Sequence, residues 1–141
     1  MIIADTGYWL ALANPRDRYH EVARTSLDSL DEALVTTWPV VTETCHLLAS
    51  RLNQASVIRF MEHAAEGAFK IRDFGAYDLE RIPELMRKYA DLPMDLADSS
   101  LVLLAESLGH GRIFSTDQRD FQTYRWKNHK PFENLLIPYS A

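Results

Sequence analysis

Short apolar runs alternate with amphipathic segments along this chain. The runs at Ile2–Ala4, 33–36, 69–71, Arg112–Phe114 and 135–137 have the length of strands. Between them, apolar residues recur at every third or fourth position, which is the period of a helix that packs one face on a core. Strands that alternate with helices in this way predict an α/β fold with a parallel sheet sandwiched between helices.

The helical segments have recognisable ends. Thr6 and Ser56 are expected as N-caps, and Pro39 stands near the first position of a helix, where its missing N–H costs little. Gly67 and Gly109 are expected to end two helices. The segments predicted to be helical are 8–13, 20–30, the stretch from 39, 56–66, 79–89, 96–108 and 118–125.

Composition limits the class of protein. A chain of 141 residues, 47% of them hydrophobic, is long enough for one domain with a buried core. The single cysteine excludes a disulfide framework. No apolar run approaches the roughly 18 residues of a membrane span, and the first residues lack a basic signal. We therefore expect a soluble, cytoplasmic protein with no membrane association.

Net charge limits the partners. The formal charge of -5 argues against nucleic-acid binding through charge alone, since that mode needs Lys and Arg side chains to neutralise phosphates. A nucleic-acid substrate remains compatible with this sequence if metal ions supply the missing positive charge.

Four acidic residues stand where parallel strands end or helices begin. Asp5 directly follows the first strand, and Asp117 lies just past the strand Arg112–Phe114. Asp98 falls in the first turns of an apolar helix, and Glu43 lies about one turn into the helix that begins near Pro39. The carboxyl ends of strands form the edge where open α/β sheets bind ligands. Carboxylates brought together there repel one another, and a divalent cation relieves that repulsion.

Each acid taken alone has a simpler interpretation. An Asp before a helix is most often an N-cap, which applies to Asp5 and to either Asp95 or Asp98. Asp117 fits an ordinary turn. Glu43 is harder to explain in this way, because acids are rarely buried in apolar helices without a partner. The functional interpretation therefore depends on the four residues as a set.

The acids also stand in the order and local sequence of a known family. They occur in Ile-Ala-Asp5-Thr, Thr42-Glu43, Met94-Asp-Leu-Ala-Asp98 and Ser115-Thr-Asp117-Gln-Arg-Asp-Phe121. Over its whole length the chain resembles the PIN-domain ribonucleases, most closely the VapC-type toxins of type II toxin–antitoxin systems. The resemblance implies that residues 1–141 form a single PIN domain, with a central parallel sheet of about five strands flanked by helices on both sides.

The same resemblance implies a function and its residues. The implied activity is endonucleolytic RNA cleavage with Mg²⁺ or Mn²⁺, and the implied partners are RNA, a small cognate antitoxin and a second copy in a homodimer. Carried over by position, the catalytic residues are Asp5, Glu43, Asp98 and Asp117. Asp5, Asp98 and Asp117 are implied to bind metal. Thr6, Ser115 and Asp120 are expected to support them, and Ser115 keeps the hydroxyl that many members have as Thr.

A basic tract follows the last acid. Residues 119–130 mix Lys and Arg with Tyr124 and Trp126, a composition that can hold phosphates and stack on unpaired bases. A solvated loop with Trp126 packed inward explains the same tract. The candidate RNA contacts are Arg16, Arg119, Arg125 and Lys127, and Arg51 could add to them. The first two helices, with Trp9 and Leu10, are candidates for a dimer or antitoxin groove, or for core.

Other functional classes fit the sequence less well. A response-regulator receiver also gathers acids at strand ends, but Lys127 and Lys130 are badly placed for its lysine. A non-catalytic binding module whose acids only cap helices explains the sequence too. An aspartic protease is disfavoured because Asp5-Thr-Gly occurs once, and Cys45 and His46 lack the further ligands of a zinc site.

Overall fold

The computed structural model describes residues 1–137. Its strands are Ile2–Ala4 (β1), Leu34–Thr37 (β2), Lys70–Arg72 (β3), Arg112–Phe114 (β4), Arg125–Trp126 (β5), Lys130–Pro131 (β6) and Glu133–Asn134 (β7). Its helices are Thr6–Ala13 (α1), His20–Asp28 (α2), Trp38–Arg51 (α3), Gln54–Ala65 (α4), Ala76–Lys88 (α5), Leu96–Leu108 (α6) and Gln118–Thr123 (α7).

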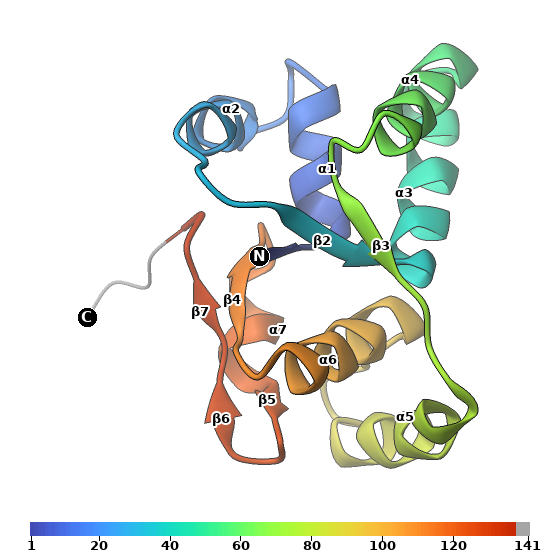
Figure 1. Cartoon of the computed structure of the whole chain (residues 1–141), viewed down its shortest axis with the longest axis vertical. Coiled ribbons are helices and arrows are strands. Elements are labelled where there is room, and N and C mark those ends of the chain that lie inside the picture. The colour runs from blue at the N-terminus through green and yellow to red at the C-terminus, as the bar shows by residue number, and fades with distance from the viewer. Residues whose placement is uncertain (138–141) are drawn as a thin grey trace.

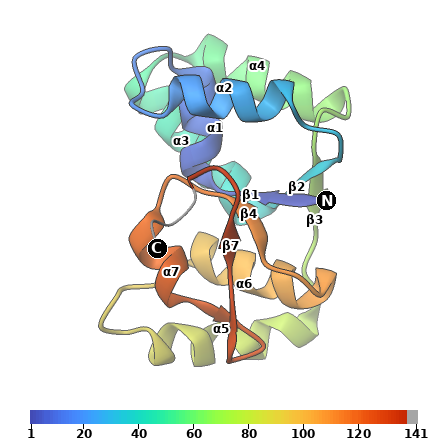
Figure 2. The same cartoon turned by 90° about the vertical axis from the view of Figure 1, so that its left-hand side faces the viewer.

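Five strands form one wholly parallel sheet in the order β3-β2-β1-β4-β7. Helices α1 to α4 lie on one side of it, and α5, α6 and α7 lie on the other (Figures 1 and 2). The predicted α/β fold with a central five-stranded parallel sheet is confirmed. Strands β2 and β3 are added on one side of the central strand β1, and the later strands β4 and β7 are added on its other side. The direction in which strands are added therefore reverses between β1 and β4. Such a switch point opens a crevice outside the carboxyl ends of the two strands.

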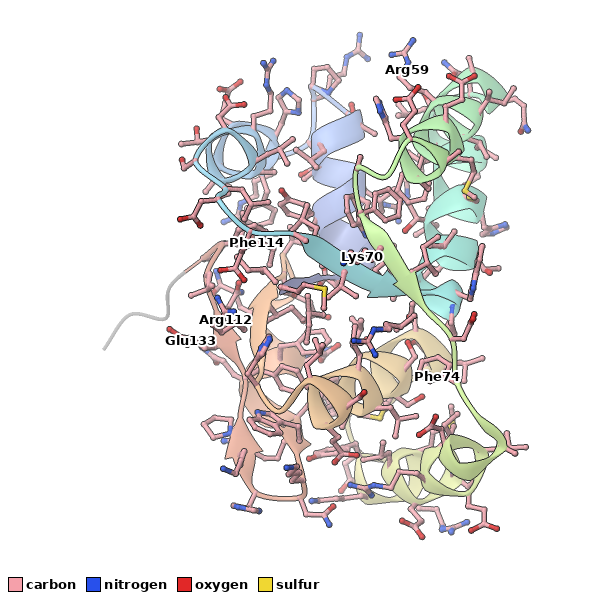
Figure 3. The ribbon with its side chains drawn as sticks, in the orientation of Figure 1. Arg59, Lys70, Phe74, Arg112, Phe114 and Glu133 are labelled. Carbon is pink, nitrogen blue, oxygen red and sulfur yellow. The ribbon has the colours of Figure 1, made fainter. Side chains whose placement is uncertain are left out.

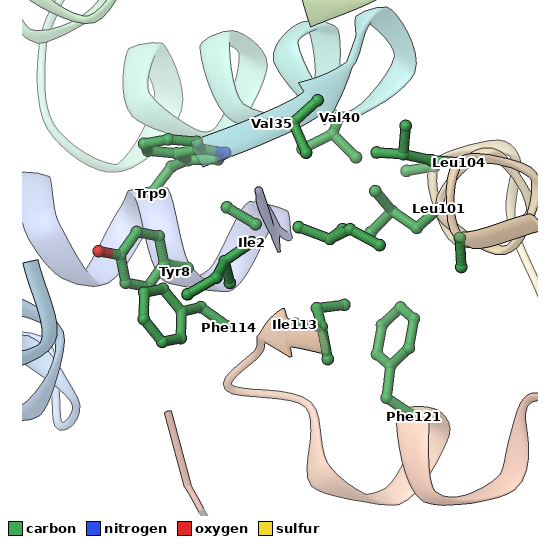
Figure 4. Packing of buried hydrophobic residues seen from close by; sticks show 14 of the residues in the cluster. Ile2, Tyr8, Trp9, Val35, Val40, Leu101, Leu104, Ile113, Phe114 and Phe121 are labelled. Atoms are coloured by element: carbon green, nitrogen blue, oxygen red, sulfur yellow. The ribbon is translucent and has the colours of Figure 1, made fainter. Parts of the chain in front are cut away.

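The core fills both faces of this sheet. Tyr8 packs on Phe114 with ring centroids 5.0 Å apart, and Leu101 and Leu104 of α6 face the other side near Ile113 (Figure 4). The residues of β1 and β2 are all buried, as expected for central strands covered by helices on both faces. The positions of the residues that follow these strands are therefore set by a rigid layer.

At the amino-terminal edge of the sheet, charges are paired. Both guanidinium Nη atoms of Arg112 donate to Glu32, at 2.8 and 2.9 Å. These hydrogen bonds lower the pKa of Glu32 to about 2. Arg112 also lies opposite Glu133 of the neighbouring strand β7 (Figure 3). The acids at this edge thus have a cation beside them.

Several local predictions were wrong. Asp5, not Thr6, caps α1, and Asn53, not Ser56, caps α4, because in each case the residue just before the helix is the one whose side-chain oxygen reaches a free N–H. The helix from 20 ends at Asp28, and that from 118 ends at Thr123. The last sheet strand is Glu133–Asn134 rather than 135–137. The hairpin of β5 and β6 was not predicted.

No helix in the described part of the chain is both long enough and apolar enough to cross a bilayer.

Candidate active site

A cavity of about 210 Å³ opens at the switch point, where β1 and β4 end. Its walls come from α1, α3, α6 and the residues that follow β4. All four predicted acids, Asp5, Glu43, Asp98 and Asp117, line it. The structure therefore brings together side chains that lie more than a hundred residues apart in sequence.

Asp5 is the most buried of the four acids. Its side chain is only 6% exposed, and its Oδ1 accepts the backbone N–H of Tyr8 at 2.9 Å. Its Oδ2 accepts the hydroxyl of the fully buried Ser115. Burial, reinforced by the charges of Asp117 and Glu43, outweighs these hydrogen bonds and raises the pKa of Asp5 to about 7.

Asp98 occupies the third position of α6. Its carboxylate accepts the backbone N–H of Asp95 at 3.3 Å, and Asp95 in turn accepts the N–H of Asp98 at 2.8 Å, so the two form a capping box. The hydroxyl of buried Tyr124 donates to Asp98 at 3.3 Å. Burial, followed by the charge of Asp95, raises the pKa of Asp98 to about 8.

Asp117 caps α7. Its Oδ1 accepts the N–H of Asp120 at 3.0 Å, and its own N–H donates to the Ser115 hydroxyl at 2.9 Å. Ser115 thereby connects Asp5 and Asp117. Burial, followed by the hydrogen bond and charge of Asp120, raises the pKa of Asp117 to about 6. Asp120 itself is buried and accepts from Arg119 Nε at 3.2 Å, but it does not line the cavity.

Glu43 faces the cavity from α3. Burial raises its pKa, and a hydrogen bond from the Thr6 side chain opposes that shift. The charge of Asp95 raises it further. Thr6 thus contacts an acid, as expected of a supporting residue, although it is the first residue of α1 rather than its cap.

Three of the acids combine capping with their place in the cavity. The amino ends of α1, α6 and α7 converge there, because Asp5, Asp98 and Asp117 each accept a backbone N–H at the start of one of these helices. The positive ends of the helices favour carboxylates. The simpler interpretation as N-caps is correct for Asp5 and Asp117, and of Asp95 and Asp98 it is Asp95 that caps α6, but capping does not account for Asp5, Glu43, Asp98 and Asp117 lining one cavity.

The acids of this cavity lack a cationic partner. In residues 1–137, ion pairs form at Glu32, Glu66, Glu84, Glu106 and Asp120, and none forms at the four cavity acids. Glu32, which has an ion-pair partner, has a lowered pKa, whereas Asp5 and Asp98, which have none within that range, have raised pKa values. A divalent cation is the group that fits such a donor set of oxygens.

The carboxylates do not form a ready-made cage. Over the described residues, no three His, Cys, Asp or Glu side chains are arranged to hold one metal ion by themselves. Mg²⁺ usually keeps several waters and takes only one or two carboxylates directly. The cavity therefore fits an ion that reaches some of its acids through water.

The predicted RNA-contacting residues lie outside the cavity. Arg16 and Arg119 are exposed, whereas Arg125 Nη1 donates to three backbone carbonyls at the end of α7, at 2.7 to 3.2 Å. The backbone N–H of Lys127 donates to Glu106. None of the four lines the cavity.

The prediction that Tyr124 and Trp126 stack on bases was wrong. Tyr124 has no exposed surface, and Trp126 is 7% exposed with its Nε1 donating to the Pro131 carbonyl at 3.0 Å. The alternative, in which Trp126 packs inward, is the one observed.

Sequence reasoning gave little weight to two residues that contact the site. Arg51 lines the cavity. It follows Glu43 by eight residues on one helix, and this spacing places both on the same helix face, which could have identified it. The contact of Tyr124 with Asp98 had no signal in the sequence. Gly7 is the second residue of α1, and a Cβ there would lie 1.9 Å from Thr116 Oγ1. Because α1 packs closely against the loop after β4, any larger residue at this position would displace the Thr116 side chain.

Comparisons with known proteins identify the family and the fold. The family model described as PIN domain matches residues 2–127. Ribonuclease VapC26 of Mycobacterium tuberculosis is 29% identical over 124 residues, which cover 88% of this chain and 92% of that protein. The crystal structure of Mycobacterium tuberculosis VapC20, described as a sarcin–ricin loop cleaving toxin, superposes with a TM-score of 0.78 at 19% identity. That match covers 84% of this chain and 92% of VapC20 and supports the fold.

Proposed function

The chain belongs to the PIN domain family, and from that membership we propose that it is a metal-dependent endoribonuclease, the toxin of a type II toxin–antitoxin pair. The observation that carries the proposal is the convergence of Asp5, Glu43, Asp98 and Asp117 on one cavity without a cationic partner. Its similarity to a protein named Ribonuclease VapC26 supports the assignment to RNA.

Each residue of the site has a proposed role. Asp5, Asp98 and Asp117 would hold Mg²⁺ or Mn²⁺, directly or through water, and Ser115 fixes the relative positions of Asp5 and Asp117. A bound divalent ion lowers the pKa of a water nucleophile and offsets the charge of the phosphate. Glu43 orients the attacking water by accepting a hydrogen bond from it. The water oxygen bonds to phosphorus as the bond from phosphorus to the leaving ribose oxygen breaks. The water loses a proton to solvent, and the ribose oxygen takes one from solvent.

The antitoxin partner has a candidate surface. A second cavity of about 510 Å³ lies among α1, α2 and α4 and is lined by Trp9, Leu27 and Phe60. Leu27 is 41% exposed at its rim, whereas Trp9 and Leu10 are themselves buried. We propose that an apolar segment of the antitoxin covers this cavity. Co-purification with the product of the adjacent reading frame should be lost in Leu27→Asp, and retention would refute this placement.

Cleavage of a labelled single-stranded RNA tests the proposed activity. We expect internal cuts by the purified chain with Mg²⁺ or Mn²⁺ and none with EDTA. Because water is the nucleophile, the ribose hydroxyl is not needed, and the products should lack cyclic phosphate ends. Cleavage that persists in EDTA, or that leaves cyclic phosphates, would contradict the mechanism. The receiver and binding-module alternatives both predict no cleavage at all.

A further inference from the structure

One face of α3 lines the cavity along most of its length. Val40, Glu43, Leu47 and Arg51 are its cavity-lining residues, and their spacing of three, four and four places them in one stripe. With a rise of about 1.5 Å per residue, Arg51 lies roughly 12 Å from Glu43 along the helix axis. The cavity therefore has an acidic end, at the strand ends, and an end marked by Arg51.

Arg51 is the cationic residue of this cavity. No other Lys or Arg of residues 1–137 lines it. Arg81, Arg112 and Arg119 form ion pairs, but within the same range Arg51 forms none, even with the acids whose cavity it shares. The side chain is exposed, and its guanidinium is thus free to bind an anion.

The charge balance of the cavity favours such a group for an RNA substrate. The net charge is -5, and the four cavity acids repel phosphate. A metal ion among the acids offsets that repulsion for the phosphate being cleaved, but not for its neighbours along the strand. Arg presents a planar set of donors that matches phosphate oxygens in pairs.

We propose that Arg51 binds a backbone phosphate next to the one being cleaved and so sets the position of the RNA strand in the cavity. This inference rests on the proposed ribonuclease function. The strand then runs along the α3 stripe, and Leu10 and Leu47 form an apolar wall between the two ends.

A structural role offers a competing explanation. Arg51 lies in the last turn of α3, where a cation stabilises the helix through its dipole. Arg87 provides a matched control, because it is also exposed and also lies in the last turn of its helix, α5, but outside the cavity. A dipole effect alone would make Arg51→Gln and Arg87→Gln equivalent.

The test is steady-state cleavage of a single-stranded RNA by the full chain with saturating Mg²⁺ over a series of salt concentrations. In Arg51→Gln we expect kcat/KM to fall by about 10- to 100-fold, mainly through KM, as for the loss of a hydrogen-bonded charged contact. The slope of log kcat/KM against log salt should become shallower by about 0.7, the value for one phosphate contact on a single strand. Arg51→Lys should keep that slope.

The three readouts are Mn²⁺ affinity, KM and the salt slope of kcat/KM. Mn²⁺ affinity, measured by electron paramagnetic resonance, should be unchanged in Arg51→Gln, and Arg87→Gln should match wild type throughout. If wild type cleaves RNA and Arg51→Gln retains both its KM and its salt slope, the phosphate contact is refuted while the ribonuclease function stands. If wild type does not cleave RNA, the proposed function fails and this inference fails with it.

Discussion

Substituting Asp98 with Asn is expected to reduce metal-dependent RNA cleavage by about 100-fold or more while the protein stays folded. Removal of groups that merely orient metal ligands typically costs about 10- to 100-fold, and removal of a ligand should cost more. Asn keeps an oxygen that can accept the Asp95 N–H, so the start of α6 should be preserved. The measurement is cleavage of a labelled RNA beside thermal unfolding of the same preparation.

Asp78→Asn is the matched control for this substitution. Asp78 stands at the same third position of α5, and its carboxylate accepts the backbone N–H of Gly75 at 3.0 Å, but it lies outside the cavity. If Asp98 only caps its helix, the two variants should behave alike. Equal activity of Asp98→Asn and Asp78→Asn would therefore remove Asp98 from the mechanism.

Raising the pH from about 5 to about 8 is expected to destabilise the metal-free protein by several kcal/mol through the cavity acids. The pKa values of Asp5, Asp98 and Asp117 rise from 3.8 to about 7, 8 and 6 in the folded state. Between these values the folded protein binds more protons than the unfolded chain, so stability falls as the pH rises. Their stabilising effect is full below about pH 4 and is lost as the pH rises through about 6 for Asp117, 7 for Asp5 and 8 for Asp98.

Divalent ions and Asp5→Asn should each reverse this loss. An ion binds the ionised carboxylates, so Mn²⁺ should raise the free energy of unfolding more at pH 8 than at pH 5. At a hundredfold excess over Kd, the increase at pH 8 should be about 2.7 kcal/mol. Asp5→Asn removes a buried carboxyl group that would be ionised at pH 8, and it keeps an oxygen that accepts the Tyr8 N–H. The metal-free variant should therefore be more stable than wild type at pH 8.

The measurement is chemical denaturation in EDTA at several pH values, with wild type and Asp5→Asn compared directly. The comparison matters because His110, whose pKa is lowered by burial, contributes an opposite slope that both proteins share. A wild-type stability curve no steeper than that of Asp5→Asn would show that the cavity acids do not strain the metal-free fold.

The sheet and the acidic set were predictable from sequence because they depend on local pattern and chain order. Central strands covered on both faces read as short apolar runs, as Ile2–Ala4 and Arg112–Phe114 do. Residues that follow parallel strands meet at one edge of the sheet, which is why the sequence alone places Asp5 and Asp117 together.

The predictions that failed concern contacts that no local pattern records. The β5–β6 hairpin turns through Lys127 and Asn128, both with positive φ and neither a glycine, so the usual turn signal is missing. Helical periodicity predicts a helix over 20–30, but it does not tell whether the apolar face of that helix is covered, and Val22 and Leu27 on it are both more than a third exposed. The importance of Arg51 depends on the way α3 lies along the cavity, which is a property of the tertiary fold.

Crystals of the full chain soaked in Mn²⁺ test directly whether the acidic cavity holds a divalent ion. We expect an anomalous scattering peak inside the cavity, with at least one carboxylate of Asp5, Asp98 or Asp117 bound to the ion and the others reached directly or through water. A cavity without a peak, in crystals that bind Mn²⁺ only elsewhere on the surface, would contradict the assignment of these acids to metal-dependent cleavage.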